Sequence, residues 1–257
     1  MKTIIFFDLD GTINNKNKQS ISNNTIKLLK SLYNKKDVEL GIATGRSPNN
    51  IEILDEIAHL FKYKIFINGA LAYKNDKLVY ENSIKKEELI QIYEKINENN
   101  IMTGFILENI EYVVNLKENV SGINYSKIKS LPMMSKEILK NNNIYQIWMF
   151  DILEEEVKKI LKDTKLNKYS WHKSGFDIVD SKTNKAAAIK AMLKDYKYKL
   201  IAIGDGENDI EMIKLADVGI VMENSKFDEL KKEATYIAPH IDKDKLYEFF
   251  KEIKLIS

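Results

Sequence analysis

Two aspartates near the amino terminus have a spacing that suits acid–base or metal chemistry. The short apolar run over 3–8 ends in Asp8, and Asp10 and Gly11 come directly after it. On an extended backbone, residues two apart point to the same side, with roughly 6–7 Å between their Cα atoms. Carboxylates this close repel each other unless a cation lies between them or one of them has a raised pKa. Asp-x-Asp by itself is equally consistent with an ordinary acidic exit from a strand.

A second acidic group follows the apolar run 200–203, in the segment 204–209, which reads GDGEND. Asp205 lies in the loop, and Asp209 shares its side if a helix begins near Asn208. The Gly-x-Gly opening is also typical of a dinucleotide-binding turn, but Asp209 stands where that fingerprint needs its third glycine. Two acids would also repel a pyrophosphate. Clustered carboxylates in a chain without cysteine suit a hard, oxygen-preferring cation such as Mg²⁺.

A hydroxyl group and a lysine complete the candidate chemistry. Thr44-Gly45-Arg46 follows an apolar run, and Lys185 opens a helix later in the chain. A hydroxyl and an ammonium at strand or helix ends can bind the oxygens of a phosphoryl group. Each is weak alone, because Thr-Gly is a common turn and most lysines are solvated. Together with the two acidic segments, they would lie at the carboxyl edge of one parallel sheet, where open α/β sheets bind ligands.

Strand and helix patterns alternate over the first part of the chain. Short apolar runs that predict buried strands recur at 3–8, 38–42 and 65–67. The periodic apolar residues behind Ser22 predict a helix with that residue as its N-cap. Ser47-Pro48 predicts the start of another helix, with an apolar stripe at Ile51, Leu54, Ala58 and Phe61. Strands separated by single helices indicate a parallel sheet with helical crossovers.

The same alternation returns after Lys185. A helical stripe at 188–193 leads into the strand 200–203, and a helix is expected from about Asn208. Further strands are predicted at 218–222 and 236–238. The predicted fold class is therefore α/β, with a Rossmann-like, doubly wound parallel sheet as the core.

The middle of the chain, from about Glu81 to Lys182, has a different pattern that mixes helices with paired strands. Two hairpins are predicted in it, 102–107 with 112–115 and 169–172 with 176–179. A strongly apolar strand is expected at 144–150. Trp148 and Trp171 lie on these predicted strands, where core packing is more common than a role in substrate binding. The block 81–182 therefore predicts an inserted α+β domain.

Composition limits the classes of protein that fit. The 257 residues suit one large domain or two smaller ones, and 44% hydrophobic with 30% charged residues argues against global disorder. A net charge of +2 argues against a nucleic-acid binder that works by bulk charge. No apolar run reaches the roughly 20 residues of a membrane helix, and the start does not resemble a signal peptide. The absence of cysteine excludes disulfides and thiolate metal sites, so a cytoplasmic protein is expected.

The four motifs together resemble those of the haloacid dehalogenase superfamily. They are DLDGT from Asp8, TGR from Thr44, Lys185, and GDGEND from Gly204. The position of the insert, and the segment DVGIVMENS that ends in Asn224-Ser225, resemble the Cof-type branch. The resemblance implies a catalytic core of 1–80 and 183–257 with an α/β cap of 81–182. Asp244-Lys245 stands where the family has Asp-Gly, and Ala186 where it prefers glycine. Because Ala186 directly follows Lys185, Lys182 remains a competitor of Lys185.

The resemblance also implies roles for individual residues. Asp8 would be the nucleophile that forms an aspartyl-phosphate, and Asp10 would be the general acid and base. Mg²⁺ would be held by Asp8, the backbone carbonyl of Asp10, Asp205 and Asp209. Phosphoryl oxygens would be bound by Thr44, Gly45, Lys185 and Asn208. Arg46 and Asn68 are candidates for contact with the rest of the substrate, or for a purely structural role.

The implied activity is a Mg²⁺-dependent phosphatase acting on a small phosphorylated metabolite, such as a sugar phosphate or a phosphorylated cofactor. A phosphomutase of the phosphomannomutase type is the nearest alternative, since such enzymes share this type of cap and nucleophile. A phosphometabolite-binding module without catalysis is the third. No nucleic acid or membrane partner is expected, and the chain would be a monomer or a weak homodimer.

Overall fold

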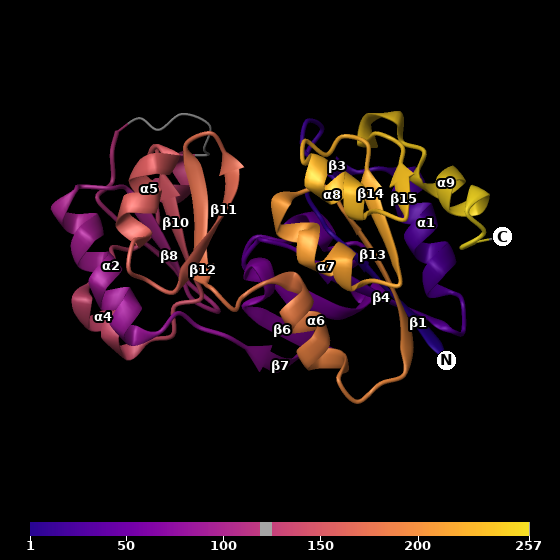
Figure 1. The fold of residues 1–257 in the computed structure, drawn as a ribbon, viewed down its shortest axis with the longest axis horizontal. Coiled ribbons are helices and arrows are strands. Elements are labelled where there is room, and N and C mark those ends of the chain that lie inside the picture. The colour runs from indigo at the N-terminus through magenta and orange to yellow at the C-terminus, as the bar shows by residue number, and fades with distance from the viewer. Residues whose placement is uncertain (119–124, 257) are drawn as a thin grey trace. The chain divides into compact units, whose positions relative to one another are not determined.

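The computed structural model describes residues 1–118 and 125–256, and its chain divides into two compact units (Figure 1). Unit 1 consists of Met1–Arg46, Asn50–Tyr80 and Asn184–Ser257, and unit 2 of Ser47–Asn49 and Glu81–Thr183. Residues 47–49 group with unit 2 rather than with the rest of 1–80, and Ser47 Oγ donates a hydrogen bond to Glu111 Oε1 at 2.6 Å. Within the described residues, no helix has both the length and the apolar character needed to cross a membrane.

Unit 1 is built on an eight-stranded sheet with the order β15-β14-β13-β1-β4-β5-β6-β7. The first six of these strands run parallel to one another, which confirms the predicted doubly wound sheet. They are β1 (Lys2–Phe7), β4 (Val38–Ala43), β5 (Phe61–Phe66), β13 (Tyr198–Gly204), β14 (Val218–Met222) and β15 (Tyr236–Ala238). Because β1 pairs with β4 on one side and with β13 on the other, it is a central strand of the sheet.

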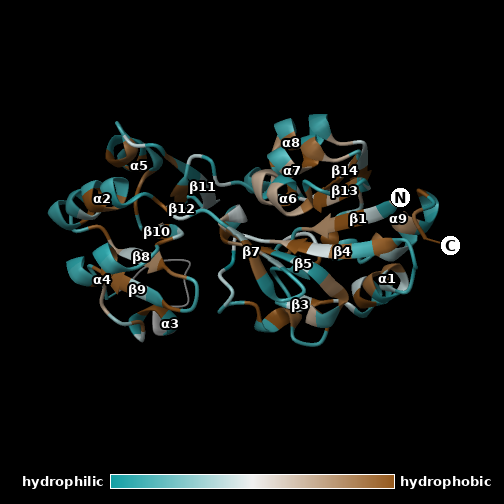
Figure 2. Cartoon of the chain, turned by 90° about the horizontal axis from the view of Figure 1, so that it is seen from below, coloured by the Kyte–Doolittle hydropathy of each residue, from teal (hydrophilic) through white to brown (hydrophobic). Residues whose placement is uncertain are grey.

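Alternate residues of the central strands are buried in two separate apolar layers. Ile5 and Phe7 of β1 pack with one layer, and Ile4 and Phe6 pack with the other. Helices α1 (Asn23–Tyr33) and α9 (Leu246–Glu252) cover the first layer. Helices α6 (Lys185–Leu193), α7 (Ile210–Leu215) and α8 (Asp228–Glu233) cover the second (Figure 2). Both faces of the sheet are thus buried, as near-continuous apolar strands require.

Two hairpins of unit 1 had no counterpart in the sequence prediction. The strands β6 (Leu71–Lys74) and β7 (Lys77–Glu81) extend the sheet, and β6 pairs antiparallel to β5. The short strands β2 (Asn14–Asn15) and β3 (Ser20–Ile21) pair with each other after β1. The predicted strand 65–67 is the end of β5, which begins four residues earlier and stops at Phe66.

The helix predicted from Ser47-Pro48 was wrong. The structure has two short 3₁₀ turns instead, Glu52–Leu54 and Ala58–Leu60, and Phe61 already belongs to β5. The buried apolar residues of this segment recur at every third position, at Leu54, Ile57 and Leu60. That spacing matches the three residues per turn of a 3₁₀ helix, whereas the predicted stripe assumed 3.6. Burial of these three side chains therefore decided the local structure.

Unit 2 has its own antiparallel sheet of five strands, in the order β11-β12-β10-β8-β9. Both predicted hairpins are confirmed, as the pairs β8–β9 and β11–β12. The strands are β8 (Thr103–Ile106), β9 (Glu111–Val114), β10 (Gln146–Phe150), β11 (Leu166–His172) and β12 (Gly175–Asp180). The helices are α2 (Lys86–Glu98), α3 (Tyr125–Lys129), α4 (Lys136–Asn141) and α5 (Glu154–Leu161).

The two faces of the unit 2 sheet differ. Ile147 and Met149 pack into an apolar core to which α2, α4 and α5 contribute (Figure 1). Trp148 alternates with them and lies on the opposite face, where its neighbours across the sheet are Gly104 and Asp177. A Cβ atom on Gly104 would come within 2.9 Å of the Trp148 ring, so glycine is needed under the indole. Trp171 is 45% exposed and is not core.

Candidate active site

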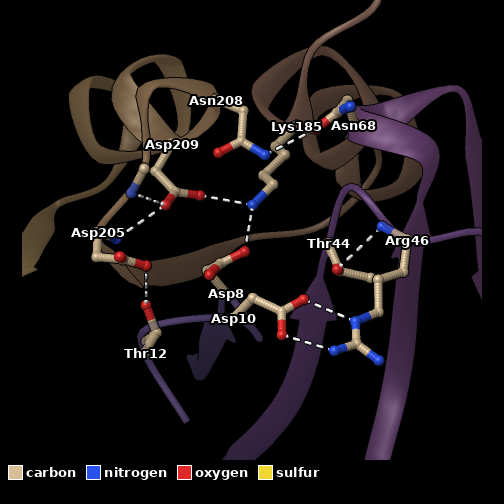
Figure 3. Close-up of polar contacts among 11 residues, drawn as sticks. Asp8, Asp10, Thr12, Thr44, Arg46, Asn68, Lys185, Asp205, Asn208 and Asp209 are labelled. Carbon is tan, nitrogen blue, oxygen red and sulfur yellow. Dashed lines mark hydrogen bonds and ion pairs between the residues drawn. The ribbon is translucent and has the colours of Figure 1, made fainter. Parts of the chain in front are cut away.

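The candidate residues of unit 1 meet at the carboxyl ends of three neighbouring strands (Figure 3). Asp8 follows β1, Thr44 follows β4 and Asp205 follows β13. Parallel pairing of β1 with both neighbours brings these ends to one edge of the sheet. The first residue of α6, Lys185, lies at the same edge. The topology therefore assembles the four motifs from positions up to about two hundred residues apart.

Lys185 is fully buried and links two of the aspartates. Its Nζ atom donates hydrogen bonds to Asp8 Oδ1 and to Asp209 Oδ1, each at 2.6 Å (Figure 3). Burial favours the neutral amine, but the two carboxylates outweigh it and raise the Lys185 pKa, so the side chain stays charged. The competing Lys182 has an exposed side chain in unit 2, and its backbone N–H donates to Asp180.

The N-terminus of α6 is fixed locally. The Asn184 side chain accepts a hydrogen bond from the Ala187 N–H at 2.8 Å and so caps the helix. Gly69, at a φ of +105°, lies against this end of the helix, and a Cβ atom there would come within 2.2 Å of the Asn184 carbonyl oxygen. Glycine at this position lets the loop after β5 approach the backbone that carries Lys185.

Three carboxylates form a cluster that can hold a metal ion. Single oxygens of Asp8, Asp205 and Asp209 lie within 4.8 Å of one another. Asp209 is oriented by the backbone, because its Oδ2 accepts the N–H groups of Asp205 and Gly206 at 2.9 and 2.8 Å. An all-oxygen donor set of this kind fits a hard divalent cation.

The electrostatics of the cluster favour a cation as well. Burial and the Asp209 charge raise the pKa of Asp8 from 3.8 to about 8, although Lys185 opposes the shift. Burial also raises the pKa of Asp205 to about 6, while Lys16 opposes it and Asp209 adds to it. Both carboxylates therefore lose their protons less readily in the free protein than an ordinary aspartate does. A bound divalent cation would supply the positive charge that stabilises their ionised forms.

Residues next to Asp205 hold it in place. Thr12 Oγ1 donates to Asp205 Oδ1 at 3.1 Å, and Asn224 Nδ2 lies 3.4 Å from Oδ2 while donating to the Gly11 carbonyl at 2.8 Å. Gly11 has a φ of +95°, and a Cβ atom there would lie only 2.2 Å from Asp205 Oδ2. The glycine after Asp10 thus leaves room for the second acidic segment.

Asp10 is paired with Arg46. The guanidinium donates from Nε to Oδ2 and from Nη2 to Oδ1, both at 2.7 Å, in a bidentate pair (Figure 3). Burial alone would raise the Asp10 pKa, but the hydrogen bonds and charge of Arg46 lower it overall. The structure thus assigns Arg46, a candidate for substrate contact, to an ion pair with Asp10.

The remaining side of the candidate active site is formed by Thr44, Gly45, Asn68 and Asn208. Thr44 is 1% exposed, and its Oγ1 accepts the Arg46 N–H at 3.2 Å. Asn208 Nδ2 donates to Asn68 Oδ1 at 2.7 Å (Figure 3), and a Cβ atom on Gly45 would approach the same Asn68 oxygen to 2.9 Å. Asn68 therefore contacts the second and fourth motifs as part of the framework.

The loop that carries Asn68 has an unusual backbone. Ile67, Asn68 and Gly69 all have positive φ, of 53°, 55° and 105°. Positive φ is uncommon for a β-branched residue such as isoleucine and costs about 1–3 kcal/mol. Backbone bonds hold the loop, since Ile67 N donates to the Arg46 carbonyl at 3.0 Å and Asn68 N to the Thr44 carbonyl at 3.1 Å.

Sequence reasoning missed three residues of the site. Thr12 and Asn224 belonged to the quoted motifs, but no contact with Asp205 was expected of them. Asn14 was not considered, although its Nδ2 donates to Asp10 Oδ1 at 2.7 Å. The signal in the sequence was its position four residues after Asp10, which places it opposite Asp10 if the intervening residues turn.

Comparison with known proteins gives one family. A family model described as haloacid dehalogenase-like hydrolase matches residues 5–250. "Putative phosphatase YkrA" of Bacillus subtilis (strain 168) is 27% identical over 261 residues, covering 99% of this chain and 98% of that protein. The 5-amino-6-(5-phospho-D-ribitylamino)uracil phosphatase YcsE of the same strain is 26% identical over 240 residues, covering 91% and 88%.

A solved structure gives the same result. The sugar phosphatase BT4131, described as a member of HAD subclass IIB, matches with a TM-score of 0.88. Its sequence is 27% identical, and the match covers 99% of this chain and 100% of that one.

Proposed function

The chain belongs to the haloacid dehalogenase-like hydrolase family, and from this premise we propose that it is a Mg²⁺-dependent phosphatase of small phosphorylated metabolites. Its relatives named above are phosphatases by name. The observation that carries the proposal is the buried contact of Lys185 with Asp8 and Asp209, beside Asp205. A carboxylate, a fixed cation and acidic side chains that could bind a metal ion thus lie within one cluster.

Asp8 is the nucleophile. One of its carboxylate oxygens attacks the phosphorus atom, the bond from phosphorus to the leaving oxygen breaks, and an aspartyl-phosphate forms. A water molecule then attacks the phosphorus, the bond to Asp8 breaks, and inorganic phosphate leaves. Lys185 stays charged throughout and stabilises negative charge on Asp8 and on the phosphoryl oxygens.

Asp10 moves the protons of both steps. As an acid it protonates the leaving oxygen, and as a base it takes the proton of the attacking water, so it returns to its starting state. The Arg46 pair holds Asp10 in its charged form in the free protein. Before it acts as the acid, Asp10 must therefore release one oxygen from Arg46 as substrate binds and take up a proton from water or from a phosphate oxygen; it gives a proton back to water when the pair with Arg46 forms again.

The remaining site residues bind the cation and the phosphoryl group. Asp8, Asp205, Asp209 and the backbone carbonyl of Asp10 are the proposed metal ligands. When bound, Mg²⁺ supplies positive charge that lets the anionic nucleophile approach an anionic phosphate. Thr44, Gly45, Asn208 and Lys185 are the proposed phosphate ligands.

Unit 2 is proposed to be the domain that recognises the part of the substrate beyond the phosphate. Support comes from the sheet face opposite α2, α4 and α5, where a small buried cluster of Met102, Val113, Ile128 and Phe150 leaves Trp148 half-buried and Trp171 exposed. Trp148 and Trp171 flank Phe150 there, with ring centroids 6.2 and 6.0 Å from it. Aromatic rings of this kind can pack against a sugar or a base.

A substrate screen tests the proposal. The purified chain is incubated with a panel of sugar phosphates, phosphorylated cofactors and p-nitrophenyl phosphate, with Mg²⁺ or with EDTA. We expect release of inorganic phosphate with Mg²⁺, loss of release with EDTA, and none from Asp8→Asn. Conversion of a hexose 1-phosphate to the 6-phosphate would identify a mutase instead. Binding without turnover across the whole panel would contradict an enzymatic function.

A further inference from the structure

Asn14, the first residue of β2, is a buried asparagine whose side chain contacts Asp10. It is 2% exposed, and its Nδ2 donates to Asp10 Oδ1 at 2.7 Å. Arg46 Nη2 donates to the same oxygen at 2.7 Å, whereas Asp10 Oδ2 has the Arg46 Nε contact at 2.7 Å. Asp10 Oδ1 therefore accepts hydrogen bonds from two side chains, Asn14 and Arg46, whereas Oδ2 accepts one from Arg46.

The backbone fixes the place of Asn14. Its N–H donates to the Leu9 carbonyl at 2.7 Å, and its own carbonyl accepts the Gly11 N–H at 2.9 Å. The segment from Leu9 to Asn14 therefore forms a turn that backbone hydrogen bonds close, with a β-bridge between Asp10 and Asn14. Because this turn is closed by backbone bonds, the Asn14 amide is brought to Asp10 whatever the state of Arg46.

The other end of the Asn14 amide is unsatisfied. Its Oδ1 is buried and has no hydrogen-bond partner among the residues that the structure describes. A buried acceptor without a partner destabilises the folded state, and an apolar side chain of similar size would avoid that cost. Reversing the amide would instead place its oxygen against the Asp10 carboxylate. The unpartnered oxygen offsets what the hydrogen bond to the charged Asp10 contributes to stability, so the contact with Asp10 explains the asparagine better than a net gain in stability does.

The next residue shows the contrast. Asn15 is also buried, and its Nδ2 donates to Asp242 Oδ1 at 2.7 Å. Its Oδ1 accepts the N–H groups of Asn17 and Lys18 at 3.0 and 3.2 Å. The oxygen of this amide closes the turn of the β2–β3 hairpin, its nitrogen ties the hairpin to Asp242, and neither contacts Asp10.

We propose that Asn14 is a positioning residue for Asp10: it holds Oδ1, so that Oδ2 is the oxygen that exchanges the proton with the leaving group. This inference rests on the proposed function, because Asp10 needs such orientation only if it is the leaving-group acid. When Arg46 releases Asp10 to a substrate, Asn14 is the contact that keeps the carboxyl from rotating. A carboxyl without it delivers its proton less often from the right direction.

The test compares two leaving groups in matched variants. We measure kcat and KM of Asn14→Leu and Asn15→Leu on p-nitrophenyl phosphate and on an alkyl phosphate that the wild type hydrolyses. Asn14→Leu should lower kcat on the alkyl phosphate by about tenfold with KM nearly unchanged, and kcat on p-nitrophenyl phosphate far less, since that leaving group needs little protonation. Its melting temperature should lie close to that of the wild type, because the lost bond to Asp10 and the removed unpartnered oxygen offset each other. Asn15→Leu should lose stability and keep the wild-type ratio of the two rates.

Asp10→Asn, measured in parallel, distinguishes a failure of the proposed mechanism from a failure of the role of Asn14. Equal losses on both substrates in Asp10→Asn would overturn its acid role and the proposed mechanism with it. A selective loss in Asp10→Asn, together with wild-type rates in Asn14→Leu, would overturn the role of Asn14 alone. Asn14→Ala is included because leucine can fit badly. If both Asn14 variants lose the two activities equally, the residue is structural and the inference fails.

Discussion

At the scale of single residues, the surroundings of each aspartate set what it can do. Asp8 and Asp10 are two positions apart, yet Asp8 contacts buried Lys185 and Asp10 contacts Arg46. Burial beside Asp209 raises the pKa of Asp8, whereas the arginine lowers the pKa of Asp10. Carboxylates with different environments can take different roles in one reaction, and the roles proposed here are those of nucleophile and proton carrier.

Metal affinity should depend on pH because of these shifts. The Asp8 pKa of about 8 and the Asp205 pKa of about 6 lie above the ordinary 3.8, so the free protein holds protons that a cation must displace. We expect Mg²⁺ to bind more tightly as pH rises from about 6 to 8, with net release of protons. Calorimetry in buffers of different ionisation enthalpy measures that release. Affinity independent of pH across this range would contradict the raised pKa values.

Lys185 should be necessary for both stability and turnover. Lys185→Met leaves Asp8 and Asp209 buried without their cation, and breaking such a pair typically costs about 3–5 kcal/mol. We expect a lower free energy of unfolding in urea with EDTA present, and loss of phosphatase activity. Lys182→Met is the matched control, because that side chain is exposed and belongs to unit 2. Loss of activity in Lys182→Met, with wild-type stability and activity in Lys185→Met, would instead assign Lys182 to the third motif.

At the scale of elements, the strands and their ends were predictable because apolar runs followed by polar residues mark them. The predicted strands 218–222 and 236–238 coincide with β14 and β15. The hairpin β6–β7 left a weaker signal, Asn75-Asp76, two residues with positive φ that a tight turn accommodates. The 3₁₀ turns before β5 could not be foreseen, because their form depends on burial of Leu54, Ile57 and Leu60 rather than on local propensity.

The loop after β5 could not be predicted either, since nothing local indicates a positive φ at Ile67. Its contact with α6 gives a prediction. Gly69→Ala would place a Cβ atom 2.2 Å from the Asn184 carbonyl in a strained backbone, so the helix end that carries Lys185 must shift. We expect a melting temperature lower by several degrees and a clear loss of kcat, checked by calorimetry and steady-state kinetics. Wild-type values for both would show that this close approach is not needed.

At the scale of the whole molecule, each of the two units buries apolar clusters of its own. The apolar residues of unit 2 pack with one another around its five-stranded sheet, between α2, α4 and α5. A fragment of residues 81–183 should therefore fold alone and unfold cooperatively, as judged by circular dichroism and dispersed amide resonances. A disordered fragment would mean that unit 2 depends on unit 1 for its stability.

The site and the substrate differ in how far sequence could define them. The four motifs predicted the cluster around Asp8, because each follows a strand or begins a helix at one sheet edge. The partners of Asp10 were not predictable, since Arg46 and Asn14 reach it only through the three-dimensional fold. The side chains of unit 2 that we propose to select the substrate, such as Trp148 and Trp171, could not be identified, because no sequence pattern gave their exposure.

The central claim is that Asp8 forms a covalent phosphoenzyme, and an acid quench during turnover tests it most directly. Wild-type protein is mixed with Mg²⁺ and a substrate found in the screen, quenched in acid within milliseconds, digested and analysed by mass spectrometry. We expect a phosphoryl group on the peptide that contains Asp8, chased away when unlabelled substrate follows a labelled pulse, and absent in Asp8→Asn. Turnover in Asp8→Asn, or a phosphoryl group on any other residue, would contradict the account.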